Sequence, residues 1–210
     1  MRQTEINAND YPSQLKDKAE FISQYFTAFA MPALEVYASE PLNYRMRAEF
    51  RVWHDGDNLY HIMFDQDTKQ KYSVETFPAA SVLINQVMAD LIDLLKNNEI
   101  ARRKIFQVDY LSSLSGKIVV SLLYHKTLND EWTAEMQSIL GKLRKKYDID
   151  IIGRAKKQKI TLDKDYLMET LTINGRDYQF KHIENSFTQP NAKVNIKMIE
   201  WAIDATKDCQ

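Results

Sequence analysis

The sequence contains little of what disulfide-bonded, flexible or membrane-spanning proteins need. A single cysteine, Cys209, in 210 residues can form no disulfide bond within the chain and no cysteine-based zinc site. Five glycines and five prolines leave little room for flexible linkers. No apolar run approaches the roughly 18 residues of a transmembrane helix, and the opening stretch MRQTEINAND lacks the apolar core of a signal peptide. We therefore expect a soluble, cytoplasmic protein.

The sequence also lacks a strong charge bias and the common catalytic motifs. Its 28 basic and 29 acidic residues give a net charge of -1, which neither favours nor excludes a nucleic-acid partner. There is no Gly-rich phosphate loop, no paired-histidine metal motif and no Gly-x-Ser-x-Gly nucleophile motif. Cys209 is a poor nucleophile candidate because no histidine lies near it in the sequence to activate it. We expect no catalytic residue and no metal site within these 210 residues.

The sequence does contain a strand and helix pattern that occurs twice. AEFRVW and LYHIMFD flank an Asp-Gly turn, and FQVDYL and KIVVSLLYHK flank the turn SSLSG, so each pair predicts a β-hairpin. An apolar stripe at helical spacing follows each hairpin, in residues 81–98 and 130–147. We therefore expect an α+β fold in which repeated ββα units form a mostly antiparallel sheet with the helices on one face, flanked by terminal helices.

Further elements are expected around this repeat. IDIIGRAKKQKITL, LTI and YQFKHI predict additional strands, the last two joined at Asn174-Gly175. Terminal helices are expected in residues 11–29 and 192–206.

The last helix has two features that the structure can test. Pro190 suits its first position, and the candidate caps are Asn185, Ser186, Thr188 and Asn191. No predicted sheet covers its apolar side. We therefore expect an exposed patch, and association through it, around Ile196, Ile199 and Ile203.

Two groups of side chains are candidates for binding RNA. Arg45, Arg47 and Arg51 in YRMRAEFR share parity, so an extended strand would bring all three to one sheet face. Arginines beside aromatic rings hold single-stranded RNA by ion pairing and stacking, although a solvated strand face fits the same pattern. Phe106 begins the second hairpin and His125 ends it, so we expect the two rings close together at one edge of the sheet. A core phenylalanine and a solvated histidine are the alternative.

Two polar stretches leave their role open. Residues 141–160 contain eight lysines and arginines against two aspartates. This stretch predicts either phosphate binding or structural roles at a helix end and an edge strand. The loop ENSFTQPN, residues 184–191, contains Gln189, whose amide matches the edge of a nucleobase, although a solvent-facing glutamine is the simpler interpretation.

Several of these stretches, taken together, resemble one known family. They are YRMRAEFRVWHDGDNLYHIMFD, FPAAS, FQVDYL, VVSLLYHK, DEW, IGRAKKQKI and ENSFTQPNAKVN, in unbroken order from about residue 10 to the last residue. This order resembles the bacterial tRNA (uracil-5-)-methyltransferase family. Members of that family transfer a methyl group from S-adenosylmethionine to C5 of a uridine in the tRNA T-loop, using a cysteine that adds to C6 and a carboxylate base. The resemblance implies the T-arm of tRNA, and tmRNA, as partners.

The resemblance also implies roles for individual residues. Arg51 in EFRVW, Phe106 in IFQVDY and His125 in LLYHK match RNA-contacting positions. Arg45 and Arg47 are expected to bind RNA beside them. Gln189 in FTQPN matches an active-site residue near the uracil and the cofactor.

The resemblance further divides the chain into three parts. Residues 1–47 are expected to be an N-terminal helical segment of the methyltransferase body, residues 48–180 an RNA-binding α+β domain, and residues 181–210 a loop and helix leading to a catalytic domain. The family's Gly-rich cofactor loop, Asp-Pro-Pro segment, Ser-Cys-Asn-Pro nucleophile motif and C-terminal Glu base do not occur in these 210 residues. We therefore expect the Rossmann-like domain to be absent, and the chain neither to bind S-adenosylmethionine nor to methylate by itself. The family is implied to be monomeric. A stand-alone RNA-binding or chaperone-like module is the alternative.

Overall fold

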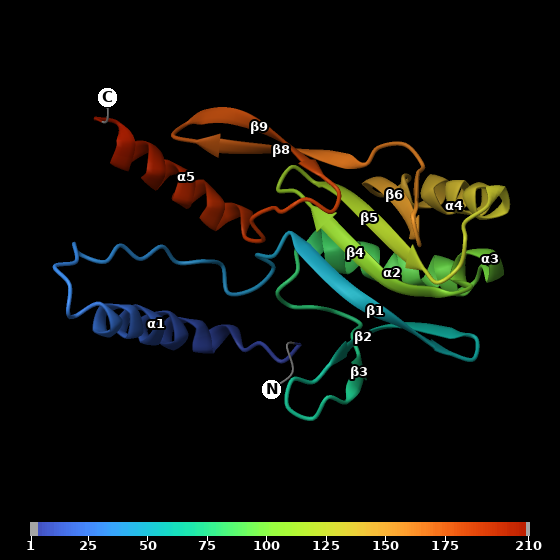
Figure 1. Ribbon diagram of the computed structural model, residues 1–210, viewed down its shortest axis with the longest axis horizontal. Helices are drawn as coiled ribbons and strands as arrows, with labels where there is room; N and C mark the ends of the chain where they lie inside the picture. Colours follow the sequence, from blue (N-terminus) through green and yellow to red (C-terminus); the bar gives the residue numbers. More distant parts are fainter. Residues whose placement is uncertain (1–3, 209–210) are drawn as a thin grey trace.

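A seven-stranded sheet forms the centre of the computed structural model, which describes residues 4–208 (Figure 1). The strand order is β3-β2-β1-β4-β5-β6-β7, and every neighbouring pair is antiparallel except β5 and β6, which are parallel. The strands are β1 (Arg47–Asp55), β2 (Asn58–Phe64), β3 (Lys71–Ser73), β4 (Ile105–Ser112), β5 (Lys117–Tyr124), β6 (Asp148–Ala155) and β7 (Gln158–Thr161). The predicted mostly antiparallel sheet is confirmed.

Helices cover one face of this sheet and are drawn behind its strands in Figure 1. They are α2 (Val82–Lys96), α3 (Glu99–Arg102) and α4 (Asp130–Leu143). The apolar residues of α2 and α4 recur at helical spacing, so they bury one side of each helix in a core shared with β1, β4 and β5. Ser81 and Asn129 cap the two helices by accepting hydrogen bonds from backbone N–H groups of the first turn. The short elements β3 and α3 were not predicted, and they interrupt a simple ββα order.

A second sheet covers part of the opposite face. It consists of β8 (Tyr166–Ile173) and β9 (Arg176–Ile183), which join at the predicted Asn174-Gly175 turn. Leu167 of β8 is buried in a cluster with Leu111, Val119 and Ile152 of the central sheet. Strands β5 and β6 are therefore buried on both faces, whereas outward side chains of β1 and β2 remain exposed. This exposed part of the sheet is where the candidate RNA-binding residues lie.

Two terminal helices, α1 (Tyr11–Tyr25) and α5 (Ala192–Thr206), extend to the left of the sheet in Figure 1. In α5, Ile196 and Ile199 pack against a small buried cluster that includes residues of β8. The prediction that these two residues are exposed is therefore wrong, because the β8–β9 hairpin supplies a sheet that covers them. The exposed large apolar residues of α5 are Met198, Trp201 and Ile203.

The helix α5 begins at Ala192, where the sequence predicts it, but Pro190 does not occupy its first position. The side-chain oxygen of Asn191 accepts a hydrogen bond from the N–H of Val194 at 3.1 Å, so Asn191, one of the predicted candidates, caps the helix. Pro190 therefore precedes the cap and is not the first helical residue, as the sequence had suggested. Its carbonyl accepts a hydrogen bond from the N–H of Met46 at 2.7 Å, which ties the loop before α5 to the start of β1.

Two kinds of site are not found in the part of the chain that the structure describes. No helix there is long and apolar enough to cross a membrane. No group of three or more His, Cys, Asp or Glu side chains within residues 4–208 could hold a metal ion. Cys209, the poor nucleophile candidate, lies outside the described residues.

The buried His61 predicts a pH dependence of stability. Its ring nitrogen Nε2 lies 2.8 Å from the hydroxyl oxygen of Tyr110, and burial lowers the pKa of the imidazole to about 4. The unfolded chain binds a proton at His61 near its ordinary pKa of about 6.5, so the free energy of unfolding should fall as the pH decreases from that value towards 4. We expect His61 to contribute a loss of about 2 kcal/mol between about pH 7 and pH 5.

Urea unfolding of the wild type and of His61→Gln at several pH values measures this contribution. Glutamine keeps a hydrogen-bonding group beside Tyr110 but cannot be protonated in this range. The difference between the two proteins should shrink as the pH falls, because the other titrating groups are common to both. Parallel pH profiles would show that His61 is not held neutral.

Candidate nucleic-acid interface

A stacked pair of rings lies at one end of the β4–β5 hairpin. The ring centroids of Phe106 and His125 are 3.8 Å apart, and their planes differ by 10°. The register of β4 shifts between Ile105 and Gln107, so Phe106 occupies a bulge, and the N–H of His125 donates to the carbonyl of Lys104 at 2.9 Å. The prediction that these two rings meet is confirmed.

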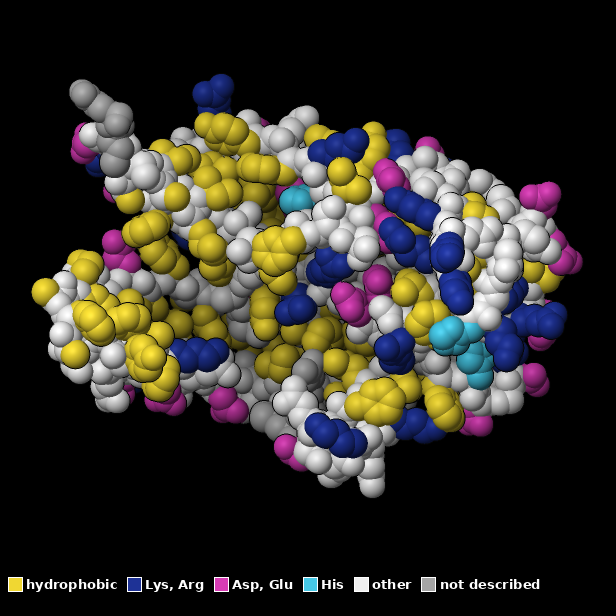
Figure 2. Space-filling model, in the orientation of Figure 1, with side chains coloured by type: hydrophobic (Ala, Val, Ile, Leu, Met, Phe, Trp, Pro, Cys, Tyr) yellow, Lys and Arg dark blue, Asp and Glu magenta, His cyan; other side chains and the backbone are white. Residues whose placement is uncertain are grey.

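Arg51 joins this pair from the neighbouring strand. It lies opposite Gln107 in the β1–β4 register, and its guanidinium carbon is 5.6 Å from the centroid of the Phe106 ring. Arg51 and His125 are exposed and Phe106 is half-buried. A cation beside stacked rings can pair with a phosphate while the rings meet a nucleobase. We call Arg51, Phe106 and His125 the ring cluster; Figure 2 shows Lys and Arg side chains gathered around histidines on this part of the surface.

Arg45 and Arg47 lie away from the ring cluster, at the start of β1. Six residues of extended chain separate Arg45 from Arg51, a distance of about 20 Å. The Nη1 group of Arg47 donates to the carbonyl of Ser186 at 2.8 Å, and Nε of Arg45 donates to the carbonyl of Arg47 at 2.8 Å. Both arginines therefore adjoin the loop of residues 184–191, so the structure does not gather the three predicted arginines at one point.

The structure places Gln189 in this loop with its side chain exposed. Among the described residues its amide has no hydrogen-bond partner, whereas the neighbouring Thr188 is buried. Arg45 forms an isolated bridge with Asn191, so the backbone beside Gln189 runs along the start of β1. One exposed amide offers hydrogen bonds to a ligand edge but does not enclose a cofactor.

Glu184 anchors the beginning of the same loop to the central sheet. Its carboxylate is buried, receives two hydrogen bonds from Arg154 at 2.7 and 2.5 Å, and receives a third from the hydroxyl of Ser121 at 2.8 Å. Burial is the largest influence and opposes ionisation, but the bonds from Arg154 and Ser121 and the charge of Lys159 outweigh it and lower the pKa of Glu184. The ionised group holds the loop that carries Gln189 against β5 and β6.

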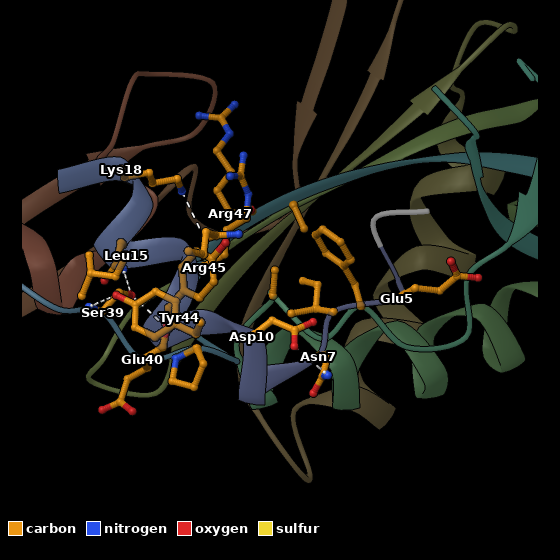
Figure 3. Close-up of a pocket in the computed structure, with 18 of the residues that line it drawn as sticks. Glu5, Asn7, Asp10, Leu15, Lys18, Ser39, Glu40, Tyr44, Arg45 and Arg47 are labelled. Carbon is orange, nitrogen blue, oxygen red and sulfur yellow. Dashed lines mark hydrogen bonds between the residues drawn. The ribbon is translucent and has the colours of Figure 1, made fainter. Parts of the chain in front are cut away.

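A hollow of about 960 Å³ lies between α1, residues 39–41 and the start of β1. In the view of Figure 3, Lys18, Arg45 and Arg47 lie together at one end of it and Glu5 lies at the other. The lining combines these three cations with the acidic Glu5, Asp10, Glu40 and Glu49, and Gln189 does not line it.

The basic stretch 141–160 is divided between cations that form ion pairs and cations for which residues 4–208 show none. Four of its eight basic side chains form ion pairs with aspartates or glutamates: Arg144, Lys146, Arg154 and Lys159. These contacts support the structural interpretation for half of the stretch. The other lysines include Lys156 and Lys157 in the turn between β6 and β7.

Sequence reasoning missed a second aromatic and cationic contact on the exposed part of the sheet. The Nζ atom of Lys71 in β3 lies 2.8 Å from the centroid of the Trp53 ring in β1. Trp53 and Tyr60 are partners in the β1–β2 register and both are exposed. The alternation in FRVWHDGDNLYHI contains the signal for the two rings, but the three residues of β3 contain no pattern that would place Lys71 beside them.

Comparison with known proteins identifies the family. Residues 10–210 match the family described as tRNA (Uracil-5-)-methyltransferase. The chain belongs to this family. The resemblance inferred from the sequence motifs is thereby confirmed.

Curated relatives in this family are similar over the whole chain. The tRNA/tmRNA (uracil-C(5))-methyltransferase of Pseudoalteromonas atlantica is 62% identical over 210 residues, which are 100% of this chain and 58% of that protein. The protein of the same description from Pseudoalteromonas translucida is 56% identical over 202 residues, 96% of this chain and 55% of its own length. The chain thus spans little more than half the length of these relatives.

A solved structure has a similar fold. The tRNA (uracil-54, C5)-methyltransferase of Pyrococcus abyssi, in complex with S-adenosyl-L-homocysteine, aligns with a TM-score of 0.62 and 13% identity. The alignment covers 92% of this chain and 48% of that one. At this identity the likeness shows only that the two chains share an arrangement of helices and strands.

Proposed function

We propose that this chain binds the T-arm of tRNA, and the corresponding arm of tmRNA, for methylation of a T-loop uridine at C5. The ring cluster carries the proposal, because it places a guanidinium and two stacked rings on an exposed sheet face. Arg51 pairs with a phosphate, and Phe106 with His125 provides the stacking surface for a base of the loop. Family membership supports tRNA as the RNA, since the named relatives are tRNA/tmRNA (uracil-C(5))-methyltransferases.

The parts of the chain have different tasks in this proposal. Residues 48–180 hold the RNA, while residues 1–47 and 181–210 belong to the methyltransferase body. Arg45 and Arg47 contact the RNA backbone at the start of β1, and Gln189 faces the uracil and cofactor. The hydrogen bonds from Arg47 to Ser186 and from Met46 to Pro190 support this arrangement, because they link the Gln189 loop to the strand that carries Arg51. Full-length members of the family act as monomers in the cytoplasm in this proposal, and the exposed Met198, Trp201 and Ile203 of α5 are where this chain would associate.

S-adenosylmethionine supplies the methyl group in the reaction of the family. The residues described here offer one exposed amide, Gln189, towards such a molecule, and no enclosing wall. The 210 residues also contain no Gly-rich cofactor loop and no Ser-Cys-Asn-Pro motif. This chain by itself therefore binds RNA without holding the cofactor and without completing the methyl transfer.

Two measurements on the same preparation test the proposal. Fluorescence anisotropy should show tighter binding to a T-arm hairpin than to a scrambled hairpin of equal length at moderate salt, because the ring cluster meets particular loop bases. Incubation with tRNA and labelled S-adenosylmethionine should yield no 5-methyluridine, with the full-length P. atlantica relative as the positive control. Equal binding of both hairpins would overturn T-arm recognition. Turnover by this chain alone would overturn the claim that it needs further residues.

A further inference from the structure

Exposed aromatic side chains continue along the sheet beyond the ring cluster. Trp53 follows Arg51 by two residues in β1 and therefore points to the same face. The register of β1 and β2 sets Tyr60 opposite Trp53, so their side chains lie side by side on that face. Trp53 is 43% exposed and Tyr60 is 37% exposed, although large aromatic rings are normally buried. The face thus presents two further rings to solvent.

A cation accompanies these rings, as Arg51 accompanies Phe106. Lys71 reaches over the Trp53 ring from β3, with its Nζ atom 2.8 Å from the ring centroid. Within the described residues no carboxylate forms an ion pair with Lys71, so its charge is not neutralised by the protein. Over β2 and β3, Figure 2 shows exposed hydrophobic side chains beside Lys and Arg side chains. A pair of exposed rings with an unneutralised ammonium over one of them offers a stacking surface to a nucleobase and a cation to its phosphate.

The second set of rings is continuous with the first. The bulge that holds Phe106 lies in β4 directly beside the Arg51 to Trp53 segment of β1. Arg51 and Trp53 are about 7 Å apart along the strand, so a nucleotide next to the one at Phe106 lies within reach of Trp53. Of the acidic residues of this face, Glu49 and Asp109 lie on the other side of Arg51, towards the start of β1, and Asp55 follows Trp53 towards the β1–β2 turn. No carboxylate stands between Arg51 and Trp53 on this face, so the two sets of rings are joined there, and Asp55 limits the surface beyond Trp53.

We propose that Trp53, Tyr60 and Lys71 form a second nucleotide-binding subsite, which stacks an unpaired base of the RNA and pairs its phosphate with Lys71. The inference rests on the proposed function and extends the RNA contact from the ring cluster towards the β1–β2 turn. The ligand is an unpaired nucleotide, because a base within a duplex has no free face to lay on Trp53. A protein partner on this face is the competing outcome of the test.

The test compares four single tryptophan and lysine variants in anisotropy titrations with a tRNA transcript. Trp53→Ala should weaken binding about tenfold, as loss of one stacked base does, whereas Trp53→Phe should restore most of the affinity. Trp201→Ala is the matched control, because Trp201 is similarly exposed on α5 and should leave binding unchanged. Lys71→Gln should reduce the slope of log K against log salt by about one, which marks a lost phosphate contact. Circular dichroism confirms that each variant is folded.

The outcomes separate this inference from the proposed function. Binding that depends on Phe106 but is unchanged in Trp53→Ala overturns the second subsite and leaves T-arm binding intact. An unchanged salt slope in Lys71→Gln overturns the phosphate contact. Absence of RNA binding by the wild-type chain overturns both proposals. Quenching of tryptophan fluorescence by RNA that disappears in Trp53→Phe, while affinity is kept, supports a base stacked directly on Trp53.

Discussion

Phe106→Ala is expected to weaken binding of a T-arm hairpin about 10- to 100-fold. The substitution removes the ring that stacks on His125 and lies beside Arg51, so a base loses its stacking surface and the guanidinium loses its support. Loss of one base-stacking contact corresponds to about 1 to 3 kcal/mol. Anisotropy titrations of the hairpin with wild type and variant measure the effect at fixed salt, because phosphate contacts depend strongly on ionic strength.

Tyr178→Ala provides the matched control for this experiment. Tyr178 is also an exposed ring with a guanidinium over it, since the Arg176 carbon lies 5.4 Å from its centroid, but it lies in β9 outside the ring cluster. The Tyr178→Ala variant should bind the hairpin as tightly as the wild type does. If both alanine variants lose affinity equally, the effect is a general one of surface aromatics and the ring cluster has no special role. If neither does, the cluster does not contact the RNA.

The second large effect concerns stability and the packing of α4 on the sheet. Gly153→Ala is expected to lower the free energy of unfolding by about 2 to 3 kcal/mol. A Cβ at Gly153 in β6 would overlap the ring of Trp132 and approach the Cδ1 of Leu128 to 2.7 Å. Trp132 is fully buried, so the ring cannot swing into solvent and the helix or the strand must shift. Urea unfolding followed by circular dichroism measures the change.

Gly141→Ala is the control because it adds the same methyl group in a different setting. Gly141 lies in α4, is exposed, and has no atom within 4 Å of an added Cβ. Alanine should stabilise this helix by about 0.5 to 1 kcal/mol, since glycine is the weaker helix former. If Gly153→Ala and the wild type unfold at the same urea concentration, β6 and α4 pack less closely than described.

The helices of the core could be predicted because their signal is local. The apolar spacing in α2 and α4 predicts helices in these places, and the structure buries those same stripes. Turn residues predict the hairpins in the same way. The strand β3 has only three residues, too few to show an alternating pattern. It is defined only by its pairing with β2, which the sequence does not predict.

The candidate site was predicted in part for a similar reason. Phe106 lies near the start of β4 and His125 follows the end of β5. Antiparallel pairing of these two neighbouring strands is enough to bring the two rings together. The distance between Arg45 and Arg51 follows from the length of extended chain between them. The shared parity of the arginines predicts a common sheet face but not that they lie at one point. The contact between Lys71 and the Trp53 ring depends on the position of a third strand, β3, which the sequence pattern does not predict.

The sequence by itself determined the family, the positions of the core helices and the Phe106 to His125 contact, because motif order, apolar period and hairpin pairing are encoded over short stretches. Only the tertiary structure decided that β8 and β9 cover α5, that Glu184 is buried against Arg154, and that β5 and β6 pair in parallel. These contacts join elements beyond one hairpin or one helix, as with Arg154 and Glu184, which are 30 residues apart in the chain. Their formation depends on which faces remain unburied once the main sheet is built, and local pattern does not contain that information.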